Sequence, residues 1–202
     1  MCQHKNVLQG QYFINRRFQS SDKRKLKITE LNRLSAIQYR NSSKTPLIVV
    51  LDHVRSMNNV GSVFRTADAF RLEAVYLCGL TAPPPHPEIH KTALGAEETV
   101  EWHFYQDTLE AILHLKQNEY ILYAVEQTEG SIPLNKITLD PAKKYALIFG
   151  NEVKGIQQIV VDECDHCVEI PQFGTKHSLN VAVAGGIVIW DFFKQLIEIN
   201  ND

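Results

Sequence analysis

Between residues 170 and 180 the chain reads Ile170-Pro171-Gln172-Phe173-Gly174-Thr175-Lys176-His177-Ser178-Leu179-Asn180, and it then enters an apolar segment that contains Gly185-Gly186. Ser178 stands where a helix N-cap is expected. Asn180 stands in the first turn of that helix, where its side chain would point to the same region as the side chain of Ser178. The helix expected from about Ser178 to Ile199 is apolar on nearly every side. Such a helix must be buried all round, by its own fold or by a second copy of the chain.

A second polar segment, Gly150-Asn151-Glu152-Val153-Lys154-Gly155, follows the apolar run Tyr145–Phe149. Two glycines around polar residues at the end of a strand suit a tight turn in which backbone groups approach a ligand closely. Ile156 stands where a Walker A loop needs lysine, and the chain contains no GxGxxG. The sequence therefore excludes the two commonest nucleotide-binding loops.

A third segment, Asn59-Val60-Gly61-Ser62-Val63-Phe64-Arg65-Thr66-Ala67, follows the apolar run Leu47–Leu51. Asn58 or Asn59 can cap a helix there, which would place free N–H groups at the edge where open α/β sheets bind ligands. Arg65, near the middle of this helix, needs an anion, and a phosphate or carboxylate matches its guanidinium. The structural alternative is an ion pair with Asp68, three residues later.

Short apolar runs alternate with helical patterns along residues 46–202, which predicts an α/β domain with a mostly parallel sheet and helices on both faces. The strand candidates are Leu47–Leu51, Ala74–Leu77, Tyr120–Val125, Tyr145–Phe149 and Val168–Ile170. The helix candidates are Val60–Phe70, Asp107–Asn118, Ile156–Val160 and Ser178–Ile199. The prolines between Pro83 and Pro87 predict an extended loop.

The charges divide the chain into a basic arm, residues 1–45, and an acidic body, residues 46–202. The arm has ten basic and two acidic side chains, a net charge of +8, whereas the body has 11 basic and 21 acidic side chains, a net charge of −10. This distribution is typical of a segment that meets a polyanion, and the alternative is a solvated tail. The candidate polyanion-binding residues of the arm, for which RNA enters only with the resemblance given below, are Arg16, Arg17, Lys23, Arg24, Lys25, Lys27 and Arg33. Thr29, followed by Leu31, Leu34 and Ile37, predicts a short amphipathic helix, and the prolyl bond at Pro46 marks the boundary.

The remaining composition indicates a cytoplasmic protein. The longest apolar stretch, Val181–Trp190, has ten residues, about half of the roughly 20 that a membrane span needs. The chain starts with no secretory pattern, and its four cysteines are too few for a disulfide scaffold. Cys164 and Cys167 have CxxC spacing but no second Cys or His pair at zinc-finger distance, so we expect no metal.

Together the three segments resemble the motifs of the SpoU branch of the SPOUT RNA methyltransferases, also called the TrmH family. They match N-x-G-x-x-x-R-x-A, G-x-E-x-x-G and I-P-x-x-G-x-x-x-S-L-N-V in that order, and residues 91–96 look like the family's loop between the first two motifs. Gln172 replaces a common methionine, and Arg71 replaces the glycine that usually follows the phenylalanine. These departures make the chain look most like the tRNA guanosine 2′-O-methyltransferases.

The resemblance implies a C-terminal deep trefoil knot, a homodimer formed through the knotted region, and transfer of a methyl group from S-adenosylmethionine to a ribose 2′-hydroxyl of RNA. Arg65 matches the family's catalytic arginine, and the other polar motif residues are Asn59, Glu152, Ser178 and Asn180. The expected cofactor-binding residues are Val125, Gly150, Ile170 and Leu179. Helix capping is an equally good account of Ser178 alone.

The arm of about 45 residues favours a guanosine in the tRNA D-loop as the target, because ribosomal RNA enzymes of the family usually carry a larger N-terminal domain and the smallest wobble-base enzymes lack an arm. The alternatives are ribosomal RNA, the tRNA anticodon loop, and a non-catalytic RNA-binding or ribosome-assembly protein. Guanidinium loses its proton only above about pH 12. Arg65 is therefore interpreted as a phosphate clamp, and the family's alternative, arginine as the general base, needs a strongly depressed pKa.

Overall fold

The computed structural model describes residues 24–27, 30–31, 33–176 and 178–197. Three of the candidate RNA-binding residues, Arg16, Arg17 and Lys23, lie outside this part of the chain. None of the helices within it is long and apolar enough to cross a membrane.

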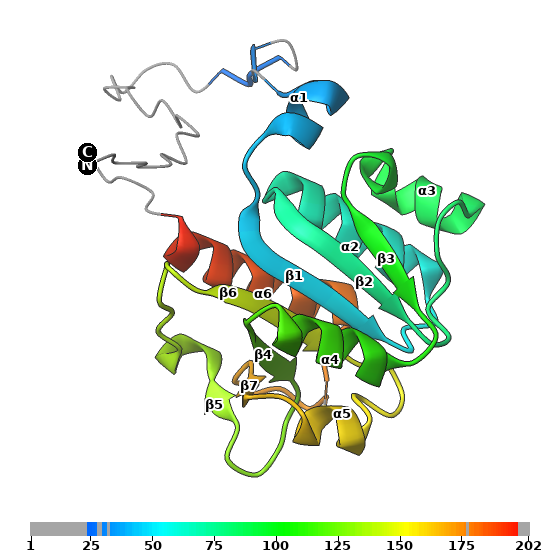
Figure 1. Cartoon of the computed structure of the whole chain (residues 1–202). Helices are drawn as coiled ribbons and strands as arrows, with labels where there is room; N and C mark the ends of the chain where they lie inside the picture. The colour runs from blue at the N-terminus through cyan, green and yellow to red at the C-terminus, as the bar shows by residue number, and fades with distance from the viewer. Residues whose placement is uncertain (1–23, 28–29, 32, 177, 198–202) are drawn as a thin grey trace.

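Within the described residues a seven-stranded sheet forms the centre of the fold, with the strand order β3-β2-β1-β6-β4-β7-β5 (Figure 1). All of its strand pairings are parallel. The strands are β1 (Thr45–Asp52), β2 (Leu72–Cys78), β3 (Trp102–Tyr105), β4 (Tyr120–Val125), β5 (Ile132–Pro133), β6 (Lys144–Phe149) and β7 (His166–Glu169). The central strands are apolar along almost their whole length because both faces of a parallel sheet are covered.

Helices pack on both faces of this sheet and create two apolar clusters. The helices are α1 (Ala36–Asn41), α2 (Met57–Ala69), α3 (Pro87–Ala93), α4 (Thr108–Gln117), α5 (Gln158–Asp162) and α6 (Val181–Leu196). Helices α2 and α6 cover one face, and α4 and α5 cover the other (Figure 1). Side chains of β1 alternate between the two clusters: Val49 and Leu51 belong to the α2 and α6 cluster, and Ile48 and Val50 belong to the α4 and α5 cluster. The predicted α/β architecture is confirmed, whereas the knot stays a prediction.

Two helix starts differ from the sequence predictions because other residues provide the caps. Helix α2 begins at Met57, and its N-cap is Ser56 rather than Asn58 or Asn59. Helix α6 begins at Val181, and Asn180 rather than Ser178 caps it by accepting hydrogen bonds from two backbone N–H groups. An amide oxygen can cap a helix as well as a hydroxyl can.

The arm helix is shorter than its apolar spacing predicts. Helix α1 begins only at Ala36, where Ser35 and Gln38 form a capping box. Leu31 and Leu34 precede this cap and are exposed, so the three-residue spacing that begins at Thr29 does not mark a helix start. Thr29 itself lies outside the described residues.

Helix α6 is not buried all round in a single copy of the chain. Val188 and Phe192 are fully buried against the sheet, but Val183, Ile187 and Trp190 on its other side are 52%, 41% and 46% exposed. Spacings of three and four residues place these side chains on one stripe of the helix. One copy of the chain therefore leaves an apolar stripe in contact with solvent.

Candidate active site

A cavity of about 710 Å³ opens where β4, β6 and β7 end at the same edge of the sheet. Its walls come from these strand ends, the turn at residues 150–156, the segment 170–180 and the start of α6. All four predicted cofactor-binding residues, Val125, Gly150, Ile170 and Leu179, line it. The cavity therefore lies at the carboxyl edge where open parallel sheets bind ligands, and its size is that of a small-molecule site, about 300–1,000 Å³.

Backbone contacts close the turn between Gly150 and Gly155. Asn151 and Gly155 exchange two backbone hydrogen bonds of 3.1 and 2.9 Å, and the Asn151 side chain donates to the carbonyl of His53 at 2.8 Å. A Cβ atom on Gly150 would lie 2.1 Å from the carbonyl carbon of Gly155, and Gly155 itself has a φ of +68°. Both glycines are therefore required, one for close approach and one for its backbone angle.

Three of the predicted polar residues form one hydrogen-bonded network. Asn59 donates from Nδ2 to Oε1 of Glu152 at 3.0 Å, and Asn180 donates from Nδ2 to Oδ1 of Asn59 at 3.1 Å. The Oδ1 atom of Asn180 caps α6. The network thus joins all three sequence motifs through side chains at positions 59, 152 and 180.

The network keeps Glu152 ionised. Partial burial acts to raise the pKa of its carboxyl group, but hydrogen bonds from its own backbone, from Asn59 and from the N–H groups of Arg55 and Ser56 outweigh burial, and the pKa falls below its usual range. Glu152 therefore carries a negative charge at neutral pH at the edge of the cavity.

Arg65 does not line this cavity. It is exposed on α2 and lines a separate hollow of about 560 Å³, together with Ser62, Thr66, Lys91 and Thr92 among others. Within the described residues Arg65 makes no hydrogen bond or ion pair, and Asp68, its predicted structural partner, instead accepts a hydrogen bond from Thr99 at 3.1 Å. The guanidinium is therefore available to an external anion.

Ser178 lines the cofactor-sized cavity and is exposed. Since Asn180 caps α6, the capping role considered for Ser178 is wrong. Asn59 does not line the cavity itself and reaches it through Glu152 and Asn180, which do.

The described basic residues of the arm lie on the surface: Arg24, Lys25, Lys27 and Arg33 are all exposed. Arg24 pairs with Glu30 at 2.7 Å. Helix α1 is tied to the body by Arg40, whose Nη2 atom donates to the carbonyl of Glu98 at 2.8 Å.

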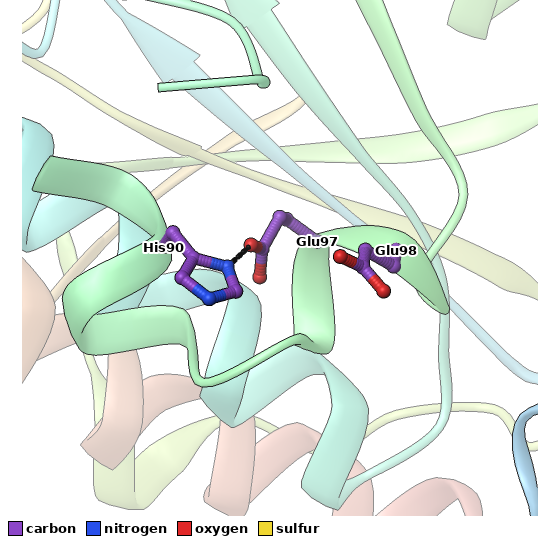
Figure 2. A group of neighbouring side chains, drawn as sticks. All are labelled: His90, Glu97 and Glu98. Carbon is purple, nitrogen blue, oxygen red and sulfur yellow. Dashed lines mark hydrogen bonds and ion pairs between the residues drawn. The ribbon is translucent and has the colours of Figure 1, made fainter. Parts of the chain in front are cut away.

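A separate ionisable cluster lies where α3 leads into the 3-10 turn Ala96–Glu98. His90, Glu97 and Glu98 offer one nitrogen and two carboxylate ligand atoms within 4.8 Å of one another (Figure 2). The shortest contact joins Nδ1 of His90 to Oε1 of Glu97 at 2.5 Å, and this hydrogen bond raises the pKa of His90. The second carboxylate oxygen of Glu97 is buried and has no hydrogen-bond partner among the described residues. The arrangement is a histidine–carboxylate pair that favours the protonated form of the imidazole.

Two functional candidates were missed from the sequence, and each is an acidic residue at the carboxyl end of a parallel strand. Asp52 ends β1 fully buried and accepts hydrogen bonds from Thr108 Oγ1 at 2.6 Å and from Gln157 N and Nε2 at 3.1 and 3.2 Å. Glu126 follows β4, lines the cavity and accepts a hydrogen bond from Ile156 N at 3.1 Å. The sequence did contain a signal for both residues: Asp52 directly follows the apolar run 47–51, and Glu126 directly follows the apolar run 120–125.

Comparisons with known proteins agree with this geometry. Residues 46–190 match a model of the SpoU rRNA Methylase family. The 23S rRNA (guanosine-2′-O-)-methyltransferase RlmB of Neisseria meningitidis serogroup B is 31% identical over 162 residues, which are 80% of this chain and 63% of that protein. The chain thus spans less than two thirds of that relative's length.

Two solved structures share the fold. The AdoMet-bound rRNA methyltransferase of Sinorhizobium meliloti has a TM-score of 0.71 and 28% identity, covering 77% of this chain and 58% of that one. The TrmH/SpoU tRNA modifying enzyme of A. aeolicus has a TM-score of 0.67 and 26% identity, covering 75% and 76%. The resemblance of the three motifs is confirmed by these matches, and the chain belongs to the SpoU methylase family.

Proposed function

We propose that the chain methylates a ribose 2′-hydroxyl of RNA with S-adenosylmethionine as the methyl donor. The observation that carries this proposal is the convergence of the three motifs on one cavity, whose walls include Val125, Gly150, Ile170 and Leu179. The relative in Neisseria meningitidis is named as a guanosine-2′-O-methyltransferase, and the structure from Sinorhizobium meliloti has AdoMet bound.

The residues of the cavity fit this cofactor. The apolar side chains of Val125, Ile170 and Leu179 can contact an adenine ring, while the polar side chains and backbone groups of the 150–155 turn can hydrogen-bond the polar parts of the molecule. When bound, the cofactor supplies an already activated sulfonium methyl group. The protein then has to align the hydroxyl and assist the loss of one proton, and alignment alone can contribute about 7–11 kcal/mol.

Arg65 acts in this proposal as the clamp for an RNA phosphate beside the reacting ribose. Its guanidinium has no partner among the described residues, and the hollow that it lines also holds Lys91 and the hydroxyl-bearing residues Ser62, Thr66 and Thr92. The two cations suit the charge and the acceptor oxygens of a phosphate, whereas the three hydroxyls donate to backbone carbonyls of Asn58 and Ser62. The fixed positive charge would lower the pKa of the neighbouring 2′-hydroxyl, and phosphate or solvent would take its proton.

The RNA target has two candidates. The basic arm, which we propose as an RNA-binding extension (residues 1–45) of the catalytic body (residues 46–202), favours a guanosine in the tRNA D-loop. The name of the Neisseria meningitidis relative favours a guanosine in 23S rRNA. Mass-spectrometric mapping of 2′-O-methylated nucleosides in a deletion strain separates them, because loss of a mark in ribosomal RNA alone would contradict the tRNA assignment.

A methylation assay with purified protein tests the catalytic proposal. Arg65→Ala should abolish methyl transfer to RNA while the dissociation constant for S-adenosylmethionine stays unchanged, because Arg65 lies outside the cofactor cavity. Lys143→Ala, which removes one exposed positive charge elsewhere, is the matched control. Normal turnover of Arg65→Ala would contradict the assigned role. A wild-type protein that binds no S-adenosylmethionine would favour the non-catalytic alternative.

We propose that the exposed stripe of α6 forms a homodimer. Val183, Ile187 and Trp190 would leave water on association, and their burial is the main driving force available to such an interface. Ile187→Glu should convert the dimer to a monomer in light scattering after size-exclusion chromatography. A monomeric wild type, or a variant that stays dimeric, would contradict this interface.

A further inference from the structure

The two hollows described above carry opposite charges. Three acidic residues, Glu126, Glu152 and Glu169, line the larger cavity, and Lys154 is the one basic residue among the described residues of its wall. The smaller hollow contains Arg65 and Lys91, and none of its described lining residues is acidic. A cation is therefore favoured in the larger cavity, and an RNA phosphate is favoured in the smaller one.

The carboxylate of Glu126 is held in place at the cavity wall. Its Oε2 atom accepts a hydrogen bond from Ile156 N at 3.1 Å, and its Oε1 atom accepts one from Gln127 N at 3.0 Å. A Cβ atom on Gly155 would lie 2.2 Å from the same Oε2 atom, so the turn and the carboxylate are in close contact. A charge fixed in this way does not have to reorganise when a cation enters.

We infer that the acidic wall makes the cavity select the sulfonium form of the cofactor over its demethylated product, with Glu126 and Glu169 as the specificity-determining residues. The inference rests on the proposed function, because it takes S-adenosylmethionine as the ligand. On transfer, the bond between sulfur and the methyl carbon breaks and a bond between that carbon and the ribose oxygen forms. The bonding electron pair stays on sulfur, and the hydroxyl proton leaves to solvent or phosphate.

The product, S-adenosylhomocysteine, is therefore a neutral thioether where the donor carried a positive charge. Both molecules share the adenosine and amino-acid groups and differ by one methyl group and one charge. If a variant weakens the contacts that both molecules share, both dissociation constants change by the same factor, and their ratio stays the same. Loss of the positive charge at sulfur weakens attraction to the wall, which would favour product release after each transfer.

The test measures dissociation constants by isothermal titration calorimetry for S-adenosylmethionine, S-adenosylhomocysteine and the amine analogue sinefungin, which restores a positive charge near the sulfur position. Glu126→Gln and Glu169→Gln each remove one charge. The new amide oxygen at position 126 can still accept from Ile156 N, but its N–H₂ then faces Gln127 N, and this local disturbance affects all three ligands alike. Glu129→Gln is the matched control because Glu129 is exposed and does not line the cavity.

We expect each cavity variant to reduce the preference for S-adenosylmethionine over S-adenosylhomocysteine by about threefold, the size of a partly exposed charge interaction. The preference for sinefungin should fall in parallel, and the control should leave both ratios unchanged. The wild-type preference should also shrink with added salt. Ratios that stay the same in both cavity variants would overturn the inference while leaving the proposed function intact. Failure of the wild type to bind any of the three ligands would instead overturn the proposed function.

Discussion

Gly61→Ala tests whether the close approach of α2 and α3 is as tight as the structure indicates. A Cβ atom at position 61 would lie 2.1 Å from Oγ1 of Thr92 and 2.3 Å from the carbonyl oxygen of Ile89. The Thr92 hydroxyl can rotate, but the Ile89 carbonyl belongs to the α3 backbone. Ordinary contact begins near 3.4 Å, so α3 must move by about 1 Å to accept the methyl group.

The expected result is a loss of stability. Alanine gains about 1 kcal/mol over glycine in a helix interior, whereas overpacking costs about 1–3 kcal/mol and occasionally more. Because the contact is with backbone, we expect the upper end of that range and a net loss of about 2 kcal/mol. For a chain of this size the melting temperature should fall by about 4–8 °C, as measured by circular dichroism.

Two further variants make this prediction decisive. Gly185→Ala is the matched control, because a Cβ atom added there, in the middle of α6, would make only ordinary contacts, with Val63 Cγ2 at 3.9 Å and Phe149 Cζ at 4.0 Å. It should stabilise the chain by about 0.5–1 kcal/mol. Adding Thr92→Ala to Gly61→Ala should rescue only part of the loss, since the Ile89 carbonyl remains. If Gly61→Ala melts at or above the wild-type temperature, the inferred packing of α2 against α3 is wrong.

Two other predictions concern charged groups. Asp52→Asn should lower the free energy of unfolding in urea by about 2 kcal/mol, because donors face both oxygens of this carboxylate. Whichever way the new amide turns, its N–H₂ would face either Gln157 N or the Thr108 Oγ1 and Gln157 Nε2 pair. An unchanged urea midpoint would count against this buried carboxylate as a support of the 150–157 turn. In an NMR titration, the pKa of His90 should lie above its ordinary value and fall in Glu97→Gln, since the hydrogen bond to Glu97 raises it. This ion pair stabilises the fold below the unfolded-state pKa of His90, and its contribution is lost as pH rises through the higher folded-state pKa. A His90 titration that is the same in both proteins would refute the pairing.

The sheet was predictable because its strands are buried on both faces. Runs such as Leu47–Leu51 and Tyr145–Phe149 are apolar without alternation, and this pattern identifies a parallel strand without knowledge of its neighbours. The place of the large cavity could be predicted by the same logic, because parallel strands bring their carboxyl ends to one edge; that it holds the cofactor stays a proposal.

The features that the sequence did not predict are short elements, or depend on contacts between elements that are distant in the sequence. Helix α3 starts directly after the proline-rich loop, because Pro87 occupies the first turn, where no N–H donor is needed. Strand β3 is a four-residue edge strand whose run, Trp102–Tyr105, is too short to give a clear pattern. Motif spacing could not show that Arg65 lies away from the large cavity, because its position depends on which face of α2 packs on the sheet.

The network of Asn59, Glu152 and Asn180 explains why amides occupy two of these motif positions. Asn59 must donate to a carboxylate and accept from another side chain at the same time, and an amide does both in one plane, whereas a carboxylate can only accept and a lysine can only donate. Asn59 thereby fixes the N-terminal end of α2 to the wall of the large cavity. Arg65 lies six residues later on the same helix, about 9 Å along its axis. One rigid helix, rather than a mobile loop, thus sets the distance between the proposed methyl donor and the proposed phosphate clamp. A methyl transfer that depends on alignment requires such a fixed distance.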